Sequence, residues 1–186
     1  MMTDKIILAS ASPRRKELLE NKGVNFVIKV SDADESIDEG TCPSGAVMEI
    51  SKRKAEAVYN EIENKSCIII AADTVVALGN KIFGKPKDES EAYSHLRSLS
   101  GRAHSVFTGV TIIKNGVCDT FFVESKVYFK NLSDEDIYSY IATKEPMDKA
   151  GSYAIQCIGS KLIEKYEGDY ENIVGLPTDE VIKRLN

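Results

Sequence analysis

The chain has 186 residues, of which 42% are hydrophobic and 28% charged, a composition that excludes disordered, collagen-like and low-complexity proteins. Lys and Arg number 24 against 29 Asp and Glu, so the formal net charge of −5 provides no overall attraction to nucleic acid or anionic lipid. We therefore expect a single domain over residues 1–186, without nucleic-acid or membrane partners, in which any anion-binding site is a local cluster.

The first predicted elements surround a polar junction. Residues 5–9 form a short apolar run, and a helix is expected directly after it. Ser12 has the position of an N-cap, Pro13 that of the first helical residue, and Gly23 that of the residue that ends the helix.

The remaining elements are predicted from apolar runs, turn residues and helix caps. Residues 67–72 are continuously apolar, which is typical of a central strand covered on both faces. In chain order, the other elements are a strand over 24–30, a helix from 44 or 45 to about 60, an apolar stretch over 75–78 turning at Gly79-Asn80 into 81–83, a helix from Asp88 to Gly101, a hairpin of 103–113 and 117–129 about Asn115-Gly116, a helix capped by Ser133, a strand near 162–166 and a helix from Thr178. This mixture predicts an α/β or α+β fold with a mixed sheet.

Cysteine and histidine usage excludes several kinds of site. The four cysteines form no Cys-x-x-Cys pair, so a zinc site or a disulfide framework is not expected. His95 and His104 have no Ser or Cys partner that would suggest a catalytic triad, and the common ATPase and dinucleotide fingerprints are absent. Because no signal peptide or membrane span is visible either, we expect a cytoplasmic protein.

The sequence Ser-Ala-Ser-Pro-Arg-Arg at residues 10–15 lies between a predicted strand and a predicted helix. A helix N-terminus favours anions, so Arg14 and Arg15 in the first turn are unfavourable unless an anion such as phosphate lies between them. The alternative is an ordinary Ser-Pro cap followed by solvated arginines.

Two charged residues lie in apolar surroundings. Asp73 is expected at the carboxyl end of the apolar strand, where ligands of open α/β sheets gather and where burial of a carboxylate is costly unless it is paired or binds a metal; otherwise it caps a turn with Thr74. Lys54 falls within an apolar helical stripe, and it either extends outward to solvent or points its charge at an anion.

Three further polar residues are weaker candidates. Lys85 stands between a glycine and a proline at the end of a hairpin, and Glu35 lies in an acidic run that could supply an oxygen ligand to Mg²⁺. Gln156 carries an amide that could read a base edge as donor and acceptor. The alternatives are an exposed lysine at a turn for Lys85, a merely solvated loop for Glu35, and an ordinary strand-edge amide for Gln156.

In order along the chain, these motifs resemble the Maf family of nucleoside triphosphate pyrophosphatases, also called septum formation inhibitor proteins. The resemblance covers essentially the whole chain. It is carried by Ser-Ala-Ser-Pro-Arg-Arg at 10–15, Ala-Asp-Thr at 72–74, Gly-Lys-Pro at 84–86, Ser-Gly-Arg-Ala-His-Ser-Val at 100–106, Glu-Pro-Met-Asp-Lys-Ala-Gly-Ser-Tyr-Ala-Ile-Gln at 145–156 and Gly-Leu-Pro at 175–177.

The resemblance implies a fold like that of inosine triphosphate pyrophosphatase, with a highly twisted mixed sheet, flanking helices and a cleft between two lobes. It also implies hydrolysis of a nucleoside triphosphate to the monophosphate and pyrophosphate with a divalent cation, Mg²⁺ or Mn²⁺, and a homodimer. The form with Gln156 is similar to the branch that acts on dTTP and UTP, with CTP and modified pyrimidine nucleotides as further candidates. The family often has Gly after this Gln, whereas Cys157 follows it here.

The resemblance also assigns roles to residues. Asp73 matches the catalytic acceptor, and Arg14, Thr74 and Gln156 match positions tied to substrate choice. The other polar positions that it places in the site are Ser12, Arg15, Glu35, Lys54 and Lys85.

These roles give a mechanistic hypothesis. The phosphates would be bound by Arg14, Arg15, Lys54 and Lys85, while Glu35 and Asp73 would hold the metal. The alternatives are a nucleotide-binding regulator of cell division without significant turnover and, with less support, a phosphatase that releases orthophosphate.

Overall fold

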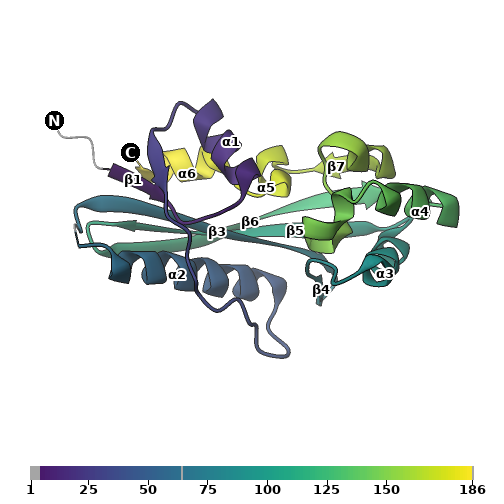
Figure 1. Cartoon of the computed structure of the whole chain (residues 1–186), viewed down its shortest axis with the longest axis horizontal. Helices are drawn as coiled ribbons and strands as arrows, with labels where there is room; N and C mark the ends of the chain where they lie inside the picture. Colours follow the sequence, from purple (N-terminus) through teal and green to yellow (C-terminus); the bar gives the residue numbers. More distant parts are fainter. Residues whose placement is uncertain (1–4, 64, 186) are drawn as a thin grey trace. The chain divides into compact units, whose positions relative to one another are not determined.

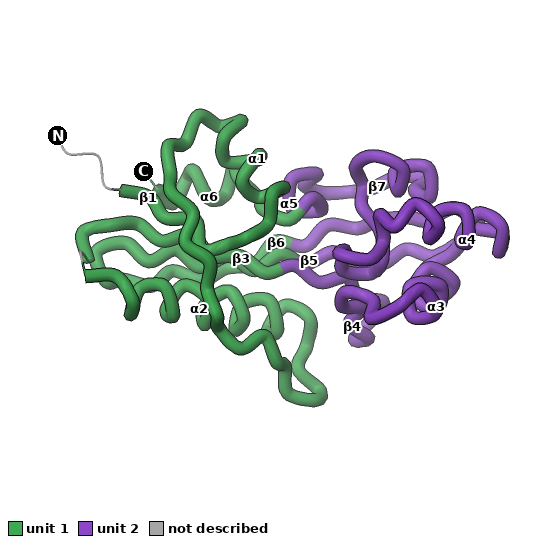
Figure 2. Tube along the Cα trace, in the orientation of Figure 1, with its two compact units in different colours: residues 1–73, 108–123, 175–186 green, residues 74–107, 124–174 purple. Residues whose placement is uncertain are grey.

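The computed structural model describes residues 5–63 and 65–185, and they group into two compact units (Figures 1 and 2). Unit 1 comprises residues 1–73, 108–123 and 175–186, and unit 2 comprises residues 74–107 and 124–174. Both units are therefore assembled from segments that are far apart in the sequence. The assignment of residues 1–186 to a single domain stays a prediction.

Helices and strands are mixed along the chain, and two pairs of strands follow one another directly. Their order is β1 (Lys5–Leu8), α1 (Pro13–Asn21), β2 (Phe26–Ile28), α2 (Pro43–Glu61), β3 (Cys67–Leu78), β4 (Lys81–Phe83), α3 (Glu89–Leu99), β5 (Ala103–Lys114), β6 (Val117–Phe129), α4 (Asp134–Ala142), the 3₁₀ helices η1 (Glu145–Asp148), η2 (Ala150–Ser152) and η3 (Cys157–Leu162), β7 (Ile163–Glu167), α5 (Tyr170–Val174) and α6 (Thr178–Leu185).

The strands form one seven-stranded sheet in the order β2-β1-β3-β5-β6-β7, with β4 paired to β3. β1 is parallel to both β2 and β3, whereas β4 is antiparallel to β3 and β7 is antiparallel to β6. The mixed α/β sheet confirms the predicted fold class. The Gly79-Asn80 turn and the Asn115-Gly116 hairpin are also confirmed, since each pair directly links two neighbouring strands.

In unit 1, α2 lies on one face of the strands, and α1 and α6 lie on the other (Figure 1). The alternation of side chains along a strand places Ile69 and Ala71 of β3 on the α2 face, where they pack with Ala55 and Val58. All four side chains are completely buried; the burial of Ile69 or Val58 contributes about 1.5–3 kcal/mol, and the methyl group of each alanine contributes about 0.8 kcal/mol.

One glycine determines how closely α2 approaches the sheet. A Cβ atom at Gly109 of β5 would lie 2.3 Å from the carbonyl oxygen of Val47 in α2, so a larger residue would push the helix away. Two residues farther along the same face of β5, the hydroxyl of Thr111 lies 3.0 Å from that of Ser51. These contacts fix α2 directly over β5.

In unit 2, local capping signals form as predicted. The Ser133 hydroxyl accepts a hydrogen bond from the backbone N–H of Asp136, whose carboxylate accepts one in return, so the capping box of α4 is complete. Asp88 caps α3 by accepting from Glu91, but Glu91 itself accepts from the backbone N–H of Lys87. In a complete capping box, the Glu91 carboxylate would accept from the backbone N–H of Asp88. In α3 it accepts from the preceding residue, Lys87, instead.

A buried histidine lies in the aromatic core of unit 2. The side chain of His104 is enclosed by Phe129 and Tyr153, and its Nε2 atom lies 2.8 Å from the hydroxyl of Tyr153. Burial lowers the pKa of His104 to about 4. The ring is therefore neutral at pH 7.

Several predicted boundaries differ from the structure. The strand expected over 24–30 is limited to Phe26–Ile28, and α2 begins earlier than expected, at Pro43. Helix α5 and the three 3₁₀ helices were not predicted, because their segments of three to six residues are too short to show a hydrophobic period.

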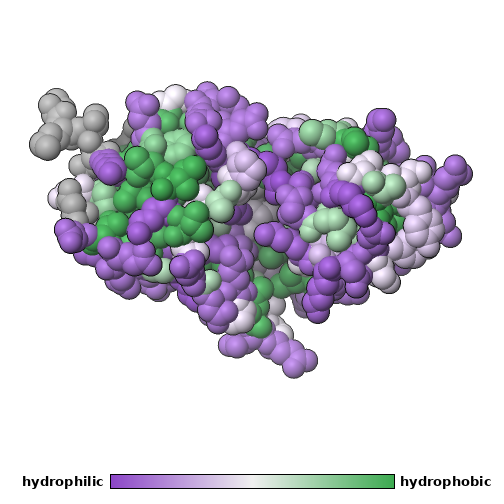
Figure 3. All heavy atoms as spheres, in the orientation of Figure 1, coloured by the Kyte–Doolittle hydropathy of each residue, from purple (hydrophilic) through white to green (hydrophobic). Residues whose placement is uncertain are grey.

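The surfaces of the two units differ in character on the face drawn in Figure 3. Hydrophilic side chains cover most of unit 2 there, whereas hydrophobic ones gather on part of unit 1. Across residues 5–63 and 65–185, no helix has the combination of length and apolarity needed to cross a membrane.

Candidate functional site

Asp73 lies within β3, and the prediction that it marks the end of a strand is wrong. The strand continues through Asp73 and Thr74 to Leu78, and its last three residues, 76–78, pair with β4. Following Ile69 and Ala71 along the same face, Asp73 points toward α2 and is only 12% exposed. A carboxylate this buried requires a partner.

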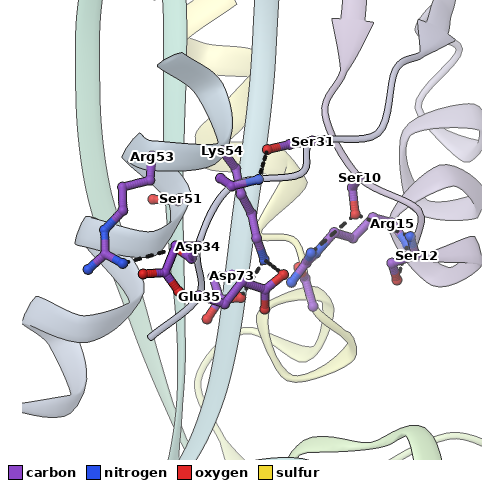
Figure 4. A network of polar contacts seen from close by, with 12 residues as sticks. Ser10, Ser12, Arg15, Ser31, Asp34, Glu35, Ser51, Arg53, Lys54 and Asp73 are labelled. Atoms are coloured by element: carbon purple, nitrogen blue, oxygen red, sulfur yellow. Dashed lines mark hydrogen bonds and ion pairs between the residues drawn. The ribbon is translucent and has the colours of Figure 1, made fainter. Parts of the chain in front are cut away.

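Lys54 of α2 is that partner. It lies in the apolar stripe of the helix, as predicted, and its side chain is 11% exposed, so it does not extend outward to solvent. Its Nζ atom donates to Asp73 Oδ1 at 2.8 Å and lies 3.0 Å from Glu35 Oε1 (Figure 4). One ammonium group thus joins a buried carboxylate of the sheet to a carboxylate of a loop.

Glu35 belongs to the irregular segment between β2 and α2. Arg53, the neighbour of Lys54, holds this segment by donating to the backbone oxygens of Asp34 at 3.0 Å and Ser36 at 2.8 Å. The Glu35 side chain itself is 59% exposed, so its attraction to Lys54 is screened more strongly than that of Asp73. Two adjacent residues of α2 therefore bind the acidic loop.

The N-terminus of α1 supplies a second cation. The predicted cap is confirmed, since the Ser12 hydroxyl accepts from the backbone N–H of Arg15. Nε of Arg15 donates to the Gly175 carbonyl at 2.8 Å, and Nη1 donates to the Ser10 hydroxyl at 3.2 Å. The guanidinium is thereby directed to the same region as Asp73 (Figure 4).

Electrostatics links Arg15 to the carboxylates. Burial lowers the pKa of Arg15, and the negative charge of Asp73 opposes this effect. Arg14 lowers the pKa of Arg15 further, whereas Glu35 raises it. The ion pairs and electrostatic interactions thus link Arg15, Glu35, Lys54 and Asp73, and Ser12 and Arg14 lie beside Arg15 at the N-terminus of α1. All six residues belong to unit 1.

Three of the predicted site residues belong to unit 2. Thr74 is adjacent to Asp73 in β3, and strand alternation places it on the opposite face. Lys85 is exposed, and the carbonyl of the preceding Gly84 accepts from the backbone N–H of Gly151 at 3.0 Å. Gln156 is half-buried and directly precedes η3.

The structure also reveals polar partners that sequence reasoning missed. Nδ1 of His95 lies 2.8 Å from the Ser152 hydroxyl, so the statement that His95 has no Ser partner is wrong. The two residues are separated by 57 positions, and no local pattern relates them. Ser152 is completely buried, so this pair is not an accessible nucleophile. Ser10 and Arg53 were also missed, although Ser10 lies within the motif at 10–15.

The carboxylate pair has suitable chemistry for a hard divalent cation. Oxygen atoms of Asp73 and Glu35 already converge on one positive centre, the ammonium of Lys54. Mg²⁺ is commonly bound by one or two carboxylates together with substrate phosphates, so two such ligands fit it. No cluster of three or more His, Cys, Asp or Glu residues suited to a metal occurs among the described residues.

Known proteins resemble the chain over nearly its whole length. A dTTP/UTP pyrophosphatase of Caldicellulosiruptor bescii is 50% identical over 187 residues, covering 98% of this chain and 92% of that protein. Proteins of the same name from a Bacillus cereus strain and from a Thermoanaerobacter species are 48% and 46% identical, covering 97% of this chain and 94% and 95% of their own.

The fold and the family of the chain are also found among known proteins. The solved structure of the Staphylococcus aureus Ham1 protein is similar in fold, with a TM-score of 0.52 and 13% sequence identity, over 86% of this chain and 80% of that chain. The family model described as Maf-like protein matches residues 5–186. The chain therefore belongs to the Maf-like protein family, as its ordered motifs predicted.

Proposed function

We propose that the protein is a nucleoside triphosphate pyrophosphatase that hydrolyses dTTP and UTP to the monophosphate and pyrophosphate. The observation that carries this proposal is the buried Lys54–Asp73 pair, joined to Glu35 and close to Arg15. This group of residues combines cations that can bind phosphate with carboxylates that can bind a metal ion and orient a water molecule. Relatives 46% to 50% identical bear the name of this activity.

Arg14, Arg15, Lys54 and Lys85 bind the phosphates in this proposal. The α1 N-terminus adds the partial positive charge of its backbone N–H groups. When water attacks the α-phosphorus, the bond to the bridging oxygen breaks and pyrophosphate leaves with the electron pair. Fixed cations are most effective here, because they offset the charge that develops on the leaving group.

Asp73 orients the attacking water and accepts its proton. Its place within a paired strand, and its 2.8 Å contact with Lys54, hold the carboxylate in a fixed orientation. General-base catalysis of this kind typically contributes about 10²–10⁴-fold to the rate. Thr74 and Gln156 contribute to substrate choice, with Gln156 reading the base edge through its amide.

Asp73 and Glu35 would hold Mg²⁺ or Mn²⁺. When bound, such an ion lowers the pKa of a coordinated water and offsets phosphate charge. We further propose that the enzyme acts on the cytoplasmic nucleotide pool as a single-domain chain that forms a homodimer. Sedimentation equilibrium tests the dimer.

The testing experiment incubates the purified protein with a panel of nucleoside triphosphates in Mg²⁺, in Mn²⁺ and in EDTA. We expect monophosphate and pyrophosphate from dTTP and UTP, and no turnover in EDTA. Release of orthophosphate and diphosphate would contradict the reaction. Turnover undiminished in EDTA would contradict the metal requirement alone.

A regulator that only binds nucleotides is the competing function. It would share the cationic groups, but a buried carboxylate among them weakens polyanion binding unless a metal joins the two. Nucleotide binding with no turnover of any triphosphate would favour the regulator.

A further inference from the structure

The segment that carries Gln156 is a small closed loop. A Cβ atom at Gly159 would lie 2.2 Å from the carbonyl oxygen of Ala154, so the backbone at these two positions is in close contact. Gln156 and Cys157 lie in the chain between them. The loop keeps this shape only while its two ends stay together.

Two side chains outside the loop hold both of its ends. The Glu145 carboxylate accepts from the backbone N–H of Gly159 at 3.0 Å and from that of Ile158 at 3.3 Å. It also accepts from the Tyr140 hydroxyl at 2.9 Å, and this hydroxyl in turn accepts from the backbone N–H of Ala154 at 3.3 Å. The bonds thus reach the chain on each side of Gln156.

The tip of the loop has a conformation that needs support. Cys157 has a φ of +54°, in the left-handed region that favours glycine. A non-glycine residue with this backbone conformation is strained, and it persists only where the surroundings enforce it. The bonds from Glu145 to the two following residues supply such a constraint.

Gln156 has the properties of a group held ready for a ligand. It is half-buried, and its amide makes no hydrogen bond to any part of the chain that the structure describes. Its orientation is therefore determined by the backbone on either side rather than by partners of its own.

We propose that Glu145 is a positioning residue for base recognition, which fixes Gln156 through the backbone of the 154–159 loop with Tyr140 as its intermediary. This inference rests on the proposed function, because it takes Gln156 to read the base. Glu145 itself does not touch the substrate. Its effect falls on the choice among nucleotides, since the phosphates are bound by other residues.

The experiment compares kcat/KM for UTP with kcat/KM for GTP. We expect Glu145→Ala to lower this ratio about tenfold, through KM, because a displaced amide loses its preference for one base edge. Gln156→Ala should lower the ratio comparably, and Glu145→Ala should have no further effect in the Gln156→Ala background. Equal losses for both nucleotides, or independent effects of the two substitutions, would overturn the proposal.

Matched variants separate positioning from folding. Tyr140→Phe removes a single hydroxyl and should lower the ratio in the same direction by a smaller factor. Glu164→Ala, at an exposed glutamate of β7, should leave the ratio unchanged. If Glu145→Ala does not fold, Tyr140→Phe decides the outcome, and an unchanged ratio there would refute the inference.

A binding measurement keeps the two proposals distinguishable. The preference for UTP over GTP is also measured as the ratio of their dissociation constants in EDTA, without turnover. Absence of turnover by the wild-type protein would defeat the proposed function. The ratio of dissociation constants would still decide whether Glu145 positions Gln156.

Discussion

The shared ammonium of Lys54 predicts an asymmetry between the two members of its buried pair. Lys54→Met leaves Asp73 buried without its cation and leaves the Glu35 carboxylate nearby, so we expect a loss of about 3–5 kcal/mol in the free energy of unfolding. Asp73→Asn retains an amide oxygen for Lys54, which also keeps Glu35 at 3.0 Å. Its expected cost is only about 1–2 kcal/mol.

The double variant sharpens this prediction. Adding Asp73→Asn to Lys54→Met removes the uncompensated buried charge, so the double variant should be more stable than Lys54→Met alone. Activity should show no such recovery, because Asp73→Asn by itself lowers turnover by about 10²–10⁴-fold. The added substitution is therefore expected to restore stability without restoring activity.

Urea unfolding in EDTA at pH 7, followed by circular dichroism, measures these differences. Lys52→Met is the matched control, since this lysine is also on α2 but is 53% exposed, and its loss should cost less than about 0.5 kcal/mol. The reasoning is refuted if Lys54→Met and Asp73→Asn are equally destabilising. A double variant less stable than Lys54→Met would refute it as well.

Two further predictions concern stability. Because the pKa of His104 is lowered from 6.5 to about 4, the unfolded chain binds the additional proton, and stability is lost as the pH falls from about 6.5 toward 4. Between pH 7 and pH 5 the free energy of unfolding in urea should fall by about 2 kcal/mol for this reason, and a His104→Gln variant should lack this loss. An unchanged pH dependence in the variant would show that His104 is not the group responsible. Gly109→Ala should lower the free energy of unfolding, measured by thermal unfolding, by about 1–3 kcal/mol because the new methyl group collides with the Val47 carbonyl. Gly84→Ala is the control and should cost much less, since an added Cβ there meets no atom within 4 Å. Equal melting temperatures for the two alanine variants would contradict the close approach of α2 to β5.

Features encoded within a few residues were predictable from the sequence. The Ser12 cap, the Ser133 capping box and the Asn115-Gly116 hairpin each depend on residues no more than four positions apart. The apolar run that begins at Cys67 likewise predicted a central strand, because burial on both faces is visible in the residues themselves.

Features that depend on distant partners were not predictable in this way. Asp73 was placed at a strand end because a carboxylate within a buried strand is costly, and the residue that removes this cost, Lys54, lies 19 positions away on a helix. The contact of His95 with Ser152 spans 57 positions. Apolar periodicity shows which side chains are buried, but not which polar groups meet across the fold.

The number of hydrogen-bond donors on Lys54 has a consequence for ligand binding. An ammonium group carries three N–H donors, of which one donates to Asp73 Oδ1, and Glu35 Oε1 lies 3.0 Å from the same nitrogen as an ion-pair partner. Among the described residues no other acceptor contacts Lys54, so one donor remains for a phosphate oxygen. A phosphate can therefore bind Lys54 as a third acceptor, while the acidic loop and the buried strand both stay attached to it.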